Sequence, residues 1–399
     1  MSPALGPVGS GRVRALLLGV FVPFAVWTVP PLLADVVRRP QANDFRLYYY
    51  AAKLGLTYGW SHLYDAGLQS RLLKDLFFQP YLNPPAMAWL VLPLSVLPFL
   101  AARVIWTVLL LVALVGAWWL LKPAGQRPQV FWLLGFLALF PAAFSIGIGQ
   151  PHTLLLLALA LAVRLRERGH DGWAGVVLSA FWLKPQIAFL LPVALIAARQ
   201  WRMLLGLGVA GGLLGVAQVV ALGPDGVRQY LAALQVASTW DLQRRFSLAG
   251  LVPSPLFLVL RVIVVGLLLA ASAGGSRKHN HALVAAPLAS LLVTPYSGFQ
   301  DLAVLCGAAW IWLRESPSPY VRVWLLVGWV AAEFTLIWGP WPIVGYQLAW
   351  IVLLAWLGVR RWRRSAAPTP EVGVGAGREA GHREPRPAAP AGPDRSVPL

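Results

Sequence analysis

Apolar runs close to the length of a membrane-spanning helix recur along this chain, separated by short polar segments. Examples run from Ala15 to Pro30, from Val104 to Leu121 and from Met203 to Leu222. A helix needs about 20 apolar residues to cross a bilayer, and a spanning segment must satisfy its own backbone hydrogen bonds. The pattern therefore predicts an all-α integral membrane protein, a polytopic helical bundle with about 12 spans. The predicted spans lie at about 13–34, 101–121, 130–148, 153–165, 172–183, 186–198, 203–222, 251–272, 281–295, 302–313, 321–338 and 342–359.

Two stretches interrupt this pattern on the outer side. Residues 35–83 form a long first outer loop with mixed charge and many aromatic residues, and 223–250 form a second one. Within the first loop, 45–56 and 64–77 have the amphipathic pattern of short helices that lie along a membrane surface. The apolar piece at 84–98 is broken by two prolines, which predicts a partial or re-entrant helix.

Charge fixes the expected orientation. The chain is 58% hydrophobic and only 12% charged, with a net charge of +18. The basic residues form short clusters between apolar runs, which is the pattern of cytoplasmic loops and excludes a nucleic-acid-binding groove. Arg12 and Arg14 before the first run predict an uncleaved signal anchor, with residues 1–12 in the cytoplasm. The tail at 361–399 begins with a basic cluster and continues rich in Pro, Gly and charge, which predicts a disordered cytoplasmic segment.

In this topology the polar turns of chemical interest fall together on the outer side. Asp44 precedes an aromatic helix and is a candidate general base for an acceptor hydroxyl; the alternative is a helix N-cap, a common role for Asp in that position. Lys184 lies between two short apolar helices, where an ammonium is costly and usually functional. It can hold a phosphate as a point charge, and the alternative is a lysine that snorkels to the interface.

Other turns add candidate polar groups. His152 is a candidate phosphate ligand or a satisfied interface histidine, and Asp301 can orient a sugar, pair with a cation such as Lys184, or cap the following helix. Arg244 and Arg245 lie outside against the positive-inside bias, which favours anion binding. The side chains expected to contact the substrates are Gln150, Tyr48, Tyr296, Gln300 and Asp301.

Some chemistry is absent from the sequence, and two charges stay open. No His-x-x-x-His or paired-Cys spacing predicts a metal site, and no glycine-rich phosphate loop predicts a nucleotide substrate. The single cysteine, Cys306, allows no intrachain disulfide. Arg261 and Glu333 lie within apolar runs, where they can pair with each other or line a cavity.

The order of these motifs resembles glycosyltransferase family 87. The motifs are Asp44 ahead of Tyr48-Tyr49-Tyr50-Ala51-Ala52, Leu63-Tyr64-Asp65, Asn83-Pro84-Pro85, Gly149-Gln150-Pro151-His152, Leu183-Lys184-Pro185, Phe246-Ser247-Leu248-Ala249-Gly250, and Thr294-Pro295-Tyr296 ahead of Gln300-Asp301-Leu302. The resemblance covers about residues 13–360. It implies a GT-C fold and an enzyme that uses a polyprenyl-phosphate sugar, with mannose as the leading precedent. It also implies Asp44 as the catalytic base and places Lys184 in the Lys-Pro motif of the family.

We therefore expect an inverting glycosyltransferase of the cytoplasmic membrane with its active site outside. Lys184, Arg244, Arg245 and His152 are expected to hold the donor phosphate. The expected partners are membrane lipid, a polyprenyl-phosphate-sugar donor and a glycan or glycolipid acceptor, with no nucleic acid and no metal or other cofactor. The alternatives are a transporter or flippase for lipid-linked sugars, for which polar groups near the midplane are typical, and a non-catalytic membrane scaffold.

Overall fold

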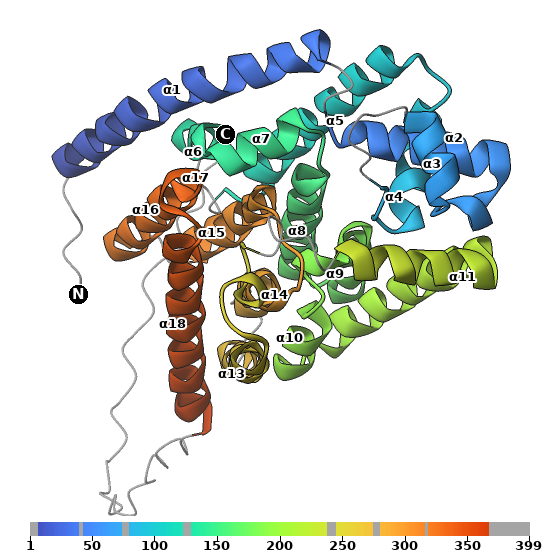
Figure 1. The fold of residues 1–399 in the computed structure, drawn as a ribbon. Coiled ribbons are helices and arrows are strands. Elements are labelled where there is room, and N and C mark those ends of the chain that lie inside the picture. Colours follow the sequence, from blue (N-terminus) through green and yellow to red (C-terminus); the bar gives the residue numbers. More distant parts are fainter. Residues whose placement is uncertain are drawn as a thin grey trace, which may run out of the picture.

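The computed structural model describes residues 7–39, 43–73, 80–122, 129–237, 245–273, 280–315 and 318–366. Its α-helices are α1 (Pro7–Arg38), α2 (Phe45–Tyr58), α3 (Ala66–Leu73), α4 (Pro85–Val91), α5 (Phe99–Leu120), α6 (Val130–Ala138), α7 (Phe140–Gly147), α8 (His152–Glu167), α9 (Asp171–Leu178), α10 (Leu191–Ala197), α11 (Trp201–Ala237), α13 (Ser254–Ser272), α14 (His281–Val293), α15 (Val304–Glu315), α16 (Pro319–Glu333), α17 (Thr335–Trp338) and α18 (Trp341–Ala366). The 3₁₀ turns are η1 (Trp60–His62), η2 (Leu92–Leu94), η3 (Ser179–Leu183), η4 (Pro185–Ile187), η5 (Leu248–Gly250) and η6 (Phe299–Ala303). No strand occurs in these ranges, so the all-helical prediction is confirmed (Figure 1).

The predicted count of about 12 crossings is not confirmed. Among the described residues, 5 helices are long and apolar enough to span a membrane, or up to 7 if each of two bent helix pairs is one span. The pair α6 and α7 bends by 76°, and the pair at 171–183 and 185–197 bends by 118°. Several predicted spans are too short for the roughly 20 residues that a straight crossing needs; α14 has 13 residues and α15 has 12.

The shortest of these helices form the centre of the molecule. All 13 residues of α14 are buried, and it packs against α10, α13, α15 and α18. On the other side of α15, α8 packs against both α5 and α9. An apolar helix that is buried all round belongs to the interior of a bundle, which explains why hydropathy alone counts it as a membrane span.

The two ends of this central group differ in chemistry. At one end, Arg166 donates to Asn280 Oδ1 at 2.6 Å, and the Asn280 backbone and side-chain nitrogens donate to Glu315 Oε1 at 2.6 and 2.8 Å. Arg361 Nη2 lies 2.8 Å from His281 Nε2 at the same end. The polar turns singled out in the sequence lie at the opposite end of α8, α14 and α15. Since α8 has 16 residues and α15 has 12, an apolar layer about 18–24 Å thick separates the two polar ends.

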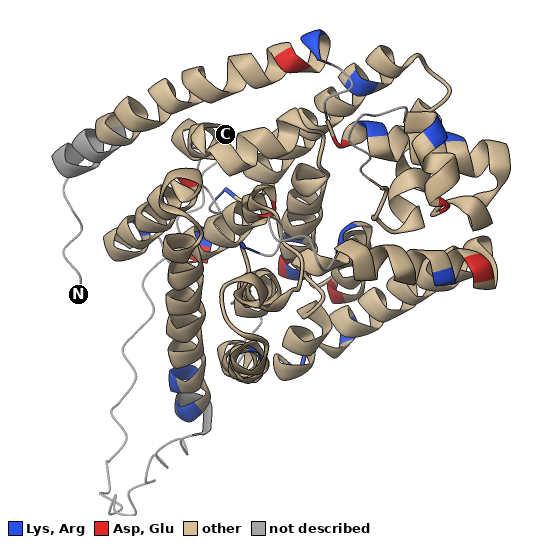
Figure 2. Ribbon diagram, in the orientation of Figure 1, with Lys and Arg blue, Asp and Glu red and all other residues tan. Residues whose placement is uncertain are grey.

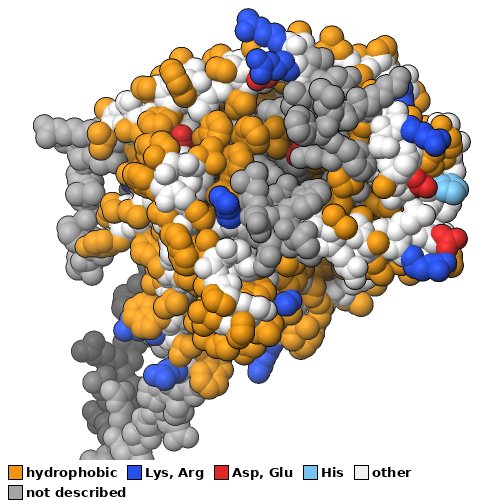
Figure 3. All heavy atoms as spheres, in the orientation of Figure 1, with side chains coloured by type: hydrophobic (Ala, Val, Ile, Leu, Met, Phe, Trp, Pro, Cys, Tyr) orange, Lys and Arg blue, Asp and Glu red, His pale blue; other side chains and the backbone are white. Residues whose placement is uncertain are grey.

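The outer surface is largely apolar. Figure 2 shows few charged residues along the long helices and a basic group at the C-terminal end of α18. Figure 3 shows hydrophobic side chains over most of one face, and large apolar residues such as Leu205, Leu213 and Val262 are more than two-thirds exposed. Soluble monomers rarely expose contiguous apolar areas of this extent, so the surface fits a lipid environment.

The structure corrects several predicted boundaries. Helices α2 and α3 stand where two surface helices were expected, but α2 is packed into the core, with Phe45, Tyr48 and Tyr49 at most 2% exposed. The loop predicted at 223–250 begins later, because the chain only breaks at Gly223 (φ 61°) and continues as helix to Ala237. Helix α1 starts at Pro7, α18 continues to Ala366, and the rest of the predicted tail lies outside the described residues. The partial helix expected at 84–98 is present as α4 and η2.

Candidate active site

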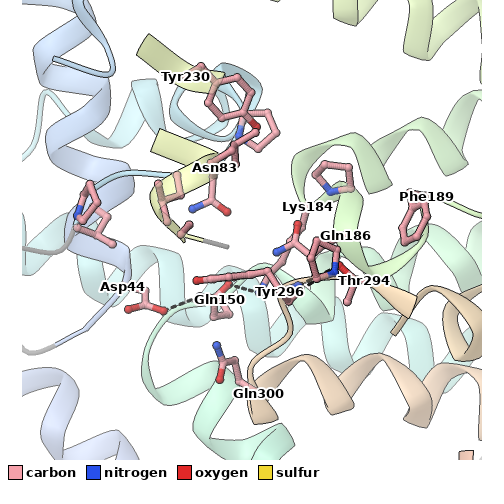
Figure 4. Close-up of a pocket in the computed structure, with 18 of the residues that line it drawn as sticks. Asp44, Asn83, Gln150, Lys184, Gln186, Phe189, Tyr230, Thr294, Tyr296 and Gln300 are labelled. Carbon is pink, nitrogen blue, oxygen red and sulfur yellow. Dashed lines mark hydrogen bonds between the residues drawn. The ribbon is translucent and has the colours of Figure 1, made fainter. Parts of the chain in front are cut away.

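A cavity of about 370 Å³ opens at the end of α8, α14 and α15 that is remote from Arg361 (Figure 4). The turn before α2, the turn before α8, the bend between η3 and η4, and the segment after α14 all line it. The segment before α4 and helices α11 and α13 contribute further parts of the wall. The fold therefore brings together four turns that are far apart in the sequence and that sequence analysis had placed on one side.

Asp44 lines the cavity and is held by its backbone. The backbone nitrogens of Asp44 and Phe45 donate to the Ile148 carbonyl at 2.9 and 3.1 Å, which ties the start of α2 to the end of α7. The Asp44 side chain makes no capping hydrogen bond to α2. Its Oδ2 instead accepts a hydrogen bond of 2.5 Å from Gln150 Nε2. Of the two roles considered for this carboxylate, the geometry favours the cavity over the helix cap.

Gln150 connects the carboxylate to a cation. Its Nε2 donates to Asp44, and its Oε1 accepts a hydrogen bond of 2.9 Å from Lys184 Nζ. The preceding residue, Gly149, has φ 83°, and a Cβ there would lie 2.7 Å from Arg103 Nη1 and 2.8 Å from the Phe45 Cβ. Only glycine satisfies both the left-handed backbone and this close approach. The glycine thus sets the turn that aims Gln150 into the cavity.

Lys184 is positioned by the 118° bend between the two short helical segments on either side of it. Pro185 follows directly, and because proline lacks an N–H and clashes with a preceding helical turn, it stops η3 and starts η4. The lysine is 3% exposed, so it does not snorkel to an interface. Its Nζ lies 2.5 Å from Asp301 Oδ1, and the two groups form a buried ion pair.

Asp301 and His152 form a layer behind Lys184. Asp301 Oδ2 accepts a hydrogen bond of 3.0 Å from the Gly298 backbone nitrogen, so it caps η6 as well as pairing with the lysine. His152 Nε2 lies 2.9 Å from Asp301 Oδ1, and its Nδ1 lies 2.7 Å from Ser145 Oγ. This pattern is satisfied when Ser145 donates to Nδ1 and the Nε2–H donates to Asp301.

The electrostatic environments of the two carboxylates differ. Burial raises the pKa of Asp44 above its usual value of 3.8, although the Gln150 hydrogen bond and the charge of Lys184 act in the opposite direction. Burial also acts to raise the pKa of Asp301, but the charge of Lys184 and the hydrogen bond from His152 outweigh it and hold that pKa well below its usual range. Asp301 is therefore a fixed anion, whereas Asp44 is a carboxylate with increased proton affinity.

The other predicted site residues divide into two groups. Tyr296 and Gln300 line the cavity with Asp44, Gln150 and Lys184. His152, Asp301 and Tyr48 are fully buried and do not line it, so the predicted direct contact of His152 with a donor phosphate is corrected: both of its ring nitrogens are engaged behind Lys184. Arg245 is exposed and is not among the lining residues. Arg244 lies outside the described residues.

The polar and charged lining residues that were not among the predicted site residues are Asn83, Gln186, Tyr230, Arg261 and Thr294. Arg261 on α13 lines the cavity and does not pair with Glu333. Glu333 instead accepts a hydrogen bond of 2.5 Å from the Phe140 backbone nitrogen at the start of α7. Asn83 and Tyr230 line another wall. The available signal for Arg261 was its charge within an apolar run, and Asn83 belongs to the Asn83-Pro84-Pro85 motif. Tyr230 carried no comparable signal.

A family model described as glycosyltransferase family 87 matches residues 81–332. No curated protein and no solved structure matches the chain. The matched segment is more than half of the chain and includes Gln150, Lys184, Arg261 and Asp301, while Asp44 precedes it. The chain belongs to glycosyltransferase family 87.

Proposed function

We propose that this membrane glycosyltransferase transfers a sugar, with mannose the first candidate, from a polyprenyl-phosphate sugar to an acceptor hydroxyl, with inversion at the anomeric carbon. The observation that carries the proposal is the juxtaposition in one cavity of a half-buried carboxylate, Asp44, with Lys184 and Arg261. A base and cations within one partly apolar pocket are what a phosphate-leaving displacement requires.

Asp44 acts as the general base. The acceptor O–H loses its proton to the Asp44 carboxylate while its oxygen bonds to the anomeric carbon of the donor sugar. The bond between that carbon and the phosphate oxygen breaks, and polyprenyl phosphate leaves with the electron pair. The raised pKa of Asp44 suits this role, because a carboxylate with greater proton affinity accepts the proton more readily.

Lys184 and Arg261 stabilise the leaving group. The donor phosphodiester carries one negative charge and the released phosphate gains another, so cations at this point favour the transition state. Lys184 has three N–H donors and uses two on Gln150 and Asp301. Lys184 Nζ also lies 3.2 Å from His152 Nε2. When Nε2 carries the proton and donates it to Asp301, Nε2 cannot accept from Lys184, and the third donor of Lys184 is left for a phosphate. Among the described residues Arg261 makes no ion pair, and it lines the cavity, so we propose that its charge faces the phosphate.

An apolar wall suits the lipid part of the donor. Leu234 and Ala237 on α11 line the cavity, together with Phe189 and Leu82. A polyprenyl chain is purely hydrocarbon, and burial of each CH₂ group away from water contributes about 0.8 kcal/mol of favourable free energy. A donor resident in the membrane would place its chain against this wall and its phosphate towards Arg261.

The remaining expectations follow from orientation and chemistry. The positive-inside bias assigns the Arg361 end to the cytoplasm, which puts the cavity on the outer face of the cytoplasmic membrane, with a glycan or glycolipid as acceptor. The donor carries its own leaving group, and we propose no metal or nucleotide cofactor.

The transporter alternative rested on Arg261 and Glu333; the first lines the cavity and the second caps α7.

The proposed activity is tested with the full chain reconstituted in nanodiscs and given a radiolabelled polyprenyl-phosphate mannose with a membrane glycolipid extract. We expect label to appear in a glycolipid product whose new linkage has the configuration opposite to that of the donor. Absence of transfer from the mannose, glucose and arabinose donors alike, or retention of configuration, would contradict the proposal. Movement of intact donor across liposomes without cleavage would instead support the transporter.

Replacement of Arg261 tests the donor phosphate site. We expect Arg261→Gln to raise the KM for the donor by about 10- to 100-fold, which corresponds to the 1.5–3 kcal/mol of a hydrogen bond to a charged group. Arg261→Lys should keep part of the affinity because the charge remains. The matched control is Arg228→Gln, since Arg228 is exposed, pairs with Asp225 and does not line the cavity. Equal donor KM values for the two glutamine variants would remove Arg261 from the site.

The pH profile reports on Asp44. The base must be ionised to accept a proton, so kcat/KM should fall as the pH drops through the pKa of Asp44. Because burial raises this pKa, the fall should occur at a higher pH than the usual value of 3.8. Thermal unfolding across the same range controls for acid denaturation. An acidic limb at or below 3.8, with the fold intact, would argue against Asp44 as the titrating base.

A further inference from the structure

One wall of the cavity has no part in the proposed chemistry. It consists of Asn83, in the turn before α4, and Tyr230, on the segment of α11 that follows Gly223. Figure 4 shows these two side chains together at one side of the cavity, with Lys184 towards the other side and Asp44 below. A molecule that lies against this wall would therefore approach Asp44 from the side opposite the donor phosphate.

The wall is held in place by two neighbouring tyrosines. Tyr64 donates to the Asn83 carbonyl at 2.6 Å, and Tyr81 donates to the Pro84 carbonyl at 2.6 Å. The Tyr64 ring also stacks between the rings of Tyr81 and Tyr230, with centroids at 5.8 and 4.5 Å. These contacts fix the backbone of the turn and cover one face of the Tyr230 ring. The wall is thus formed before any ligand binds, which reduces the ordering cost of binding.

The polar groups of this wall have unused hydrogen-bonding capacity. Among the residues that the structure describes, neither the Asn83 carboxamide nor the Tyr230 hydroxyl has a hydrogen-bond partner, and Asn83 is bonded only through its backbone. A carboxamide offers two donors and an acceptor, and a phenol offers one donor and an acceptor. An aromatic ring beside such groups suits a pyranose, which presents C–H bonds on its faces and hydroxyls at its edge.

The charge of the wall selects among sugars. Asp44 is the only charged residue that this side of the cavity contributes among the described lining residues. Both lining cations come from elsewhere: Lys184 from the bend between η3 and η4, and Arg261 from α13. Among the described lining residues, none on this side offers a cation to a carboxylate or phosphate on the bound sugar, and Asp44 would repel such a group.

From these observations we propose that Asn83 and Tyr230 form the acceptor site and that it takes an uncharged sugar unit, with a ring face on Tyr230 and hydroxyls bonded to Asn83. The proposal rests on the proposed function, because it places that sugar as the nucleophile beside Asp44. It assigns the acceptor as a neutral glycan or the neutral terminal sugar of a glycolipid.

The test compares two acceptor probes, n-octyl α-D-mannoside and n-octyl β-D-glucuronide, with labelled polyprenyl-phosphate mannose in nanodiscs. We expect transfer to the mannoside and at least 10-fold lower kcat/KM for the glucuronide. Asn83→Ala should raise the mannoside KM at least 10-fold and change the donor KM less than 2-fold. Because Tyr64 bonds the Asn83 backbone, this variant keeps the wall intact. Tyr230→Leu should raise the mannoside KM in the same way, whereas Tyr230→Trp should retain most of the affinity for the mannoside.

The opposite pattern overturns the proposal: an unchanged mannoside KM, an equal rise in donor KM, or equal use of the glucuronide. Saturation-transfer NMR with methyl α-D-mannopyranoside provides a measurement that needs no turnover. We expect saturation to be transferred to the sugar protons in the presence of the wild-type protein, and this signal to be lost with Asn83→Ala. If the wild type transfers no sugar, the proposed function fails while the NMR result still decides the site: signals of equal strength in both proteins, or none in either, reject it.

Discussion

Replacement of Asp44 by Asn is expected to lower the rate of glycosyl transfer by about 10²- to 10⁴-fold, the usual contribution of a general base. The amide keeps the size of the side chain and can still bond to Gln150 after a rotation, but it cannot accept the proton of the acceptor. The donor KM should change little, since Lys184 and Arg261 are untouched. The rate is measured by label transfer in nanodiscs under donor saturation.

Asp65 provides a matched control for this substitution. Its Oδ1 accepts a hydrogen bond of 2.8 Å from the Leu68 backbone nitrogen at the start of α3, and it does not line the cavity. Asn caps helices about as well as Asp, so Asp65→Asn should retain wild-type transfer. If Asp44→Asn also retained it, another group would have to be the base.

The second large effect is expected at the buried pair of Lys184 and Asp301. Lys184→Met leaves the Asp301 carboxylate buried without its cation, and removal of one partner from a buried pair typically costs about 3–5 kcal/mol. The variant should therefore unfold at a clearly lower temperature. It should also lose transfer by about 10²-fold or more, because a donor to the leaving phosphate is gone. Melting is followed in detergent, and transfer in nanodiscs below the melting temperature.

The double variant Lys184→Met with Asp301→Asn separates the two losses. Because the double variant has no buried unpaired carboxylate, its melting temperature should be higher than that of Lys184→Met. Activity should not return, because the ammonium is still missing. Recovery of transfer along with stability would show that Lys184 has only a structural role.

The sequence predicted the turns better than the spans. Prolines and glycines mark the turns directly: Pro185 ends a helix after Lys184, and Gly149 permits the backbone that no other residue tolerates. Hydropathy predicts burial in an apolar setting but does not distinguish lipid from protein. Helix α14 is apolar and fully buried by protein, and at 13 residues it resembles a short span in a hydropathy pattern. The predicted number of crossings therefore exceeds the number of long helices.

The site was predictable as a set of turns on one side, but its internal contacts were not. Gln150 lies 106 residues from Asp44 along the chain, and no local pattern indicates that one amide bridges Asp44 and Lys184. His152 resembles an exposed ligand in sequence, yet the packing of Ser145 and Asp301 around it leaves it no exposed nitrogen. Arg261 appears in the middle of an apolar run, and only the packing of α13 beside the cavity brings it to the candidate site.

The single carboxamide between the base and the ammonium has a consequence of its own. A carboxylate in direct contact with an ammonium would become a weak base, because the cation favours its ionised form. Gln150 holds Asp44 and Lys184 together through two hydrogen bonds while keeping them from direct contact. An amide does not titrate, so the bridging group itself does not change with pH. In the proposed reaction, a proton acceptor and an anion ligand of opposite charge can thus lie side by side without forming a direct ion pair.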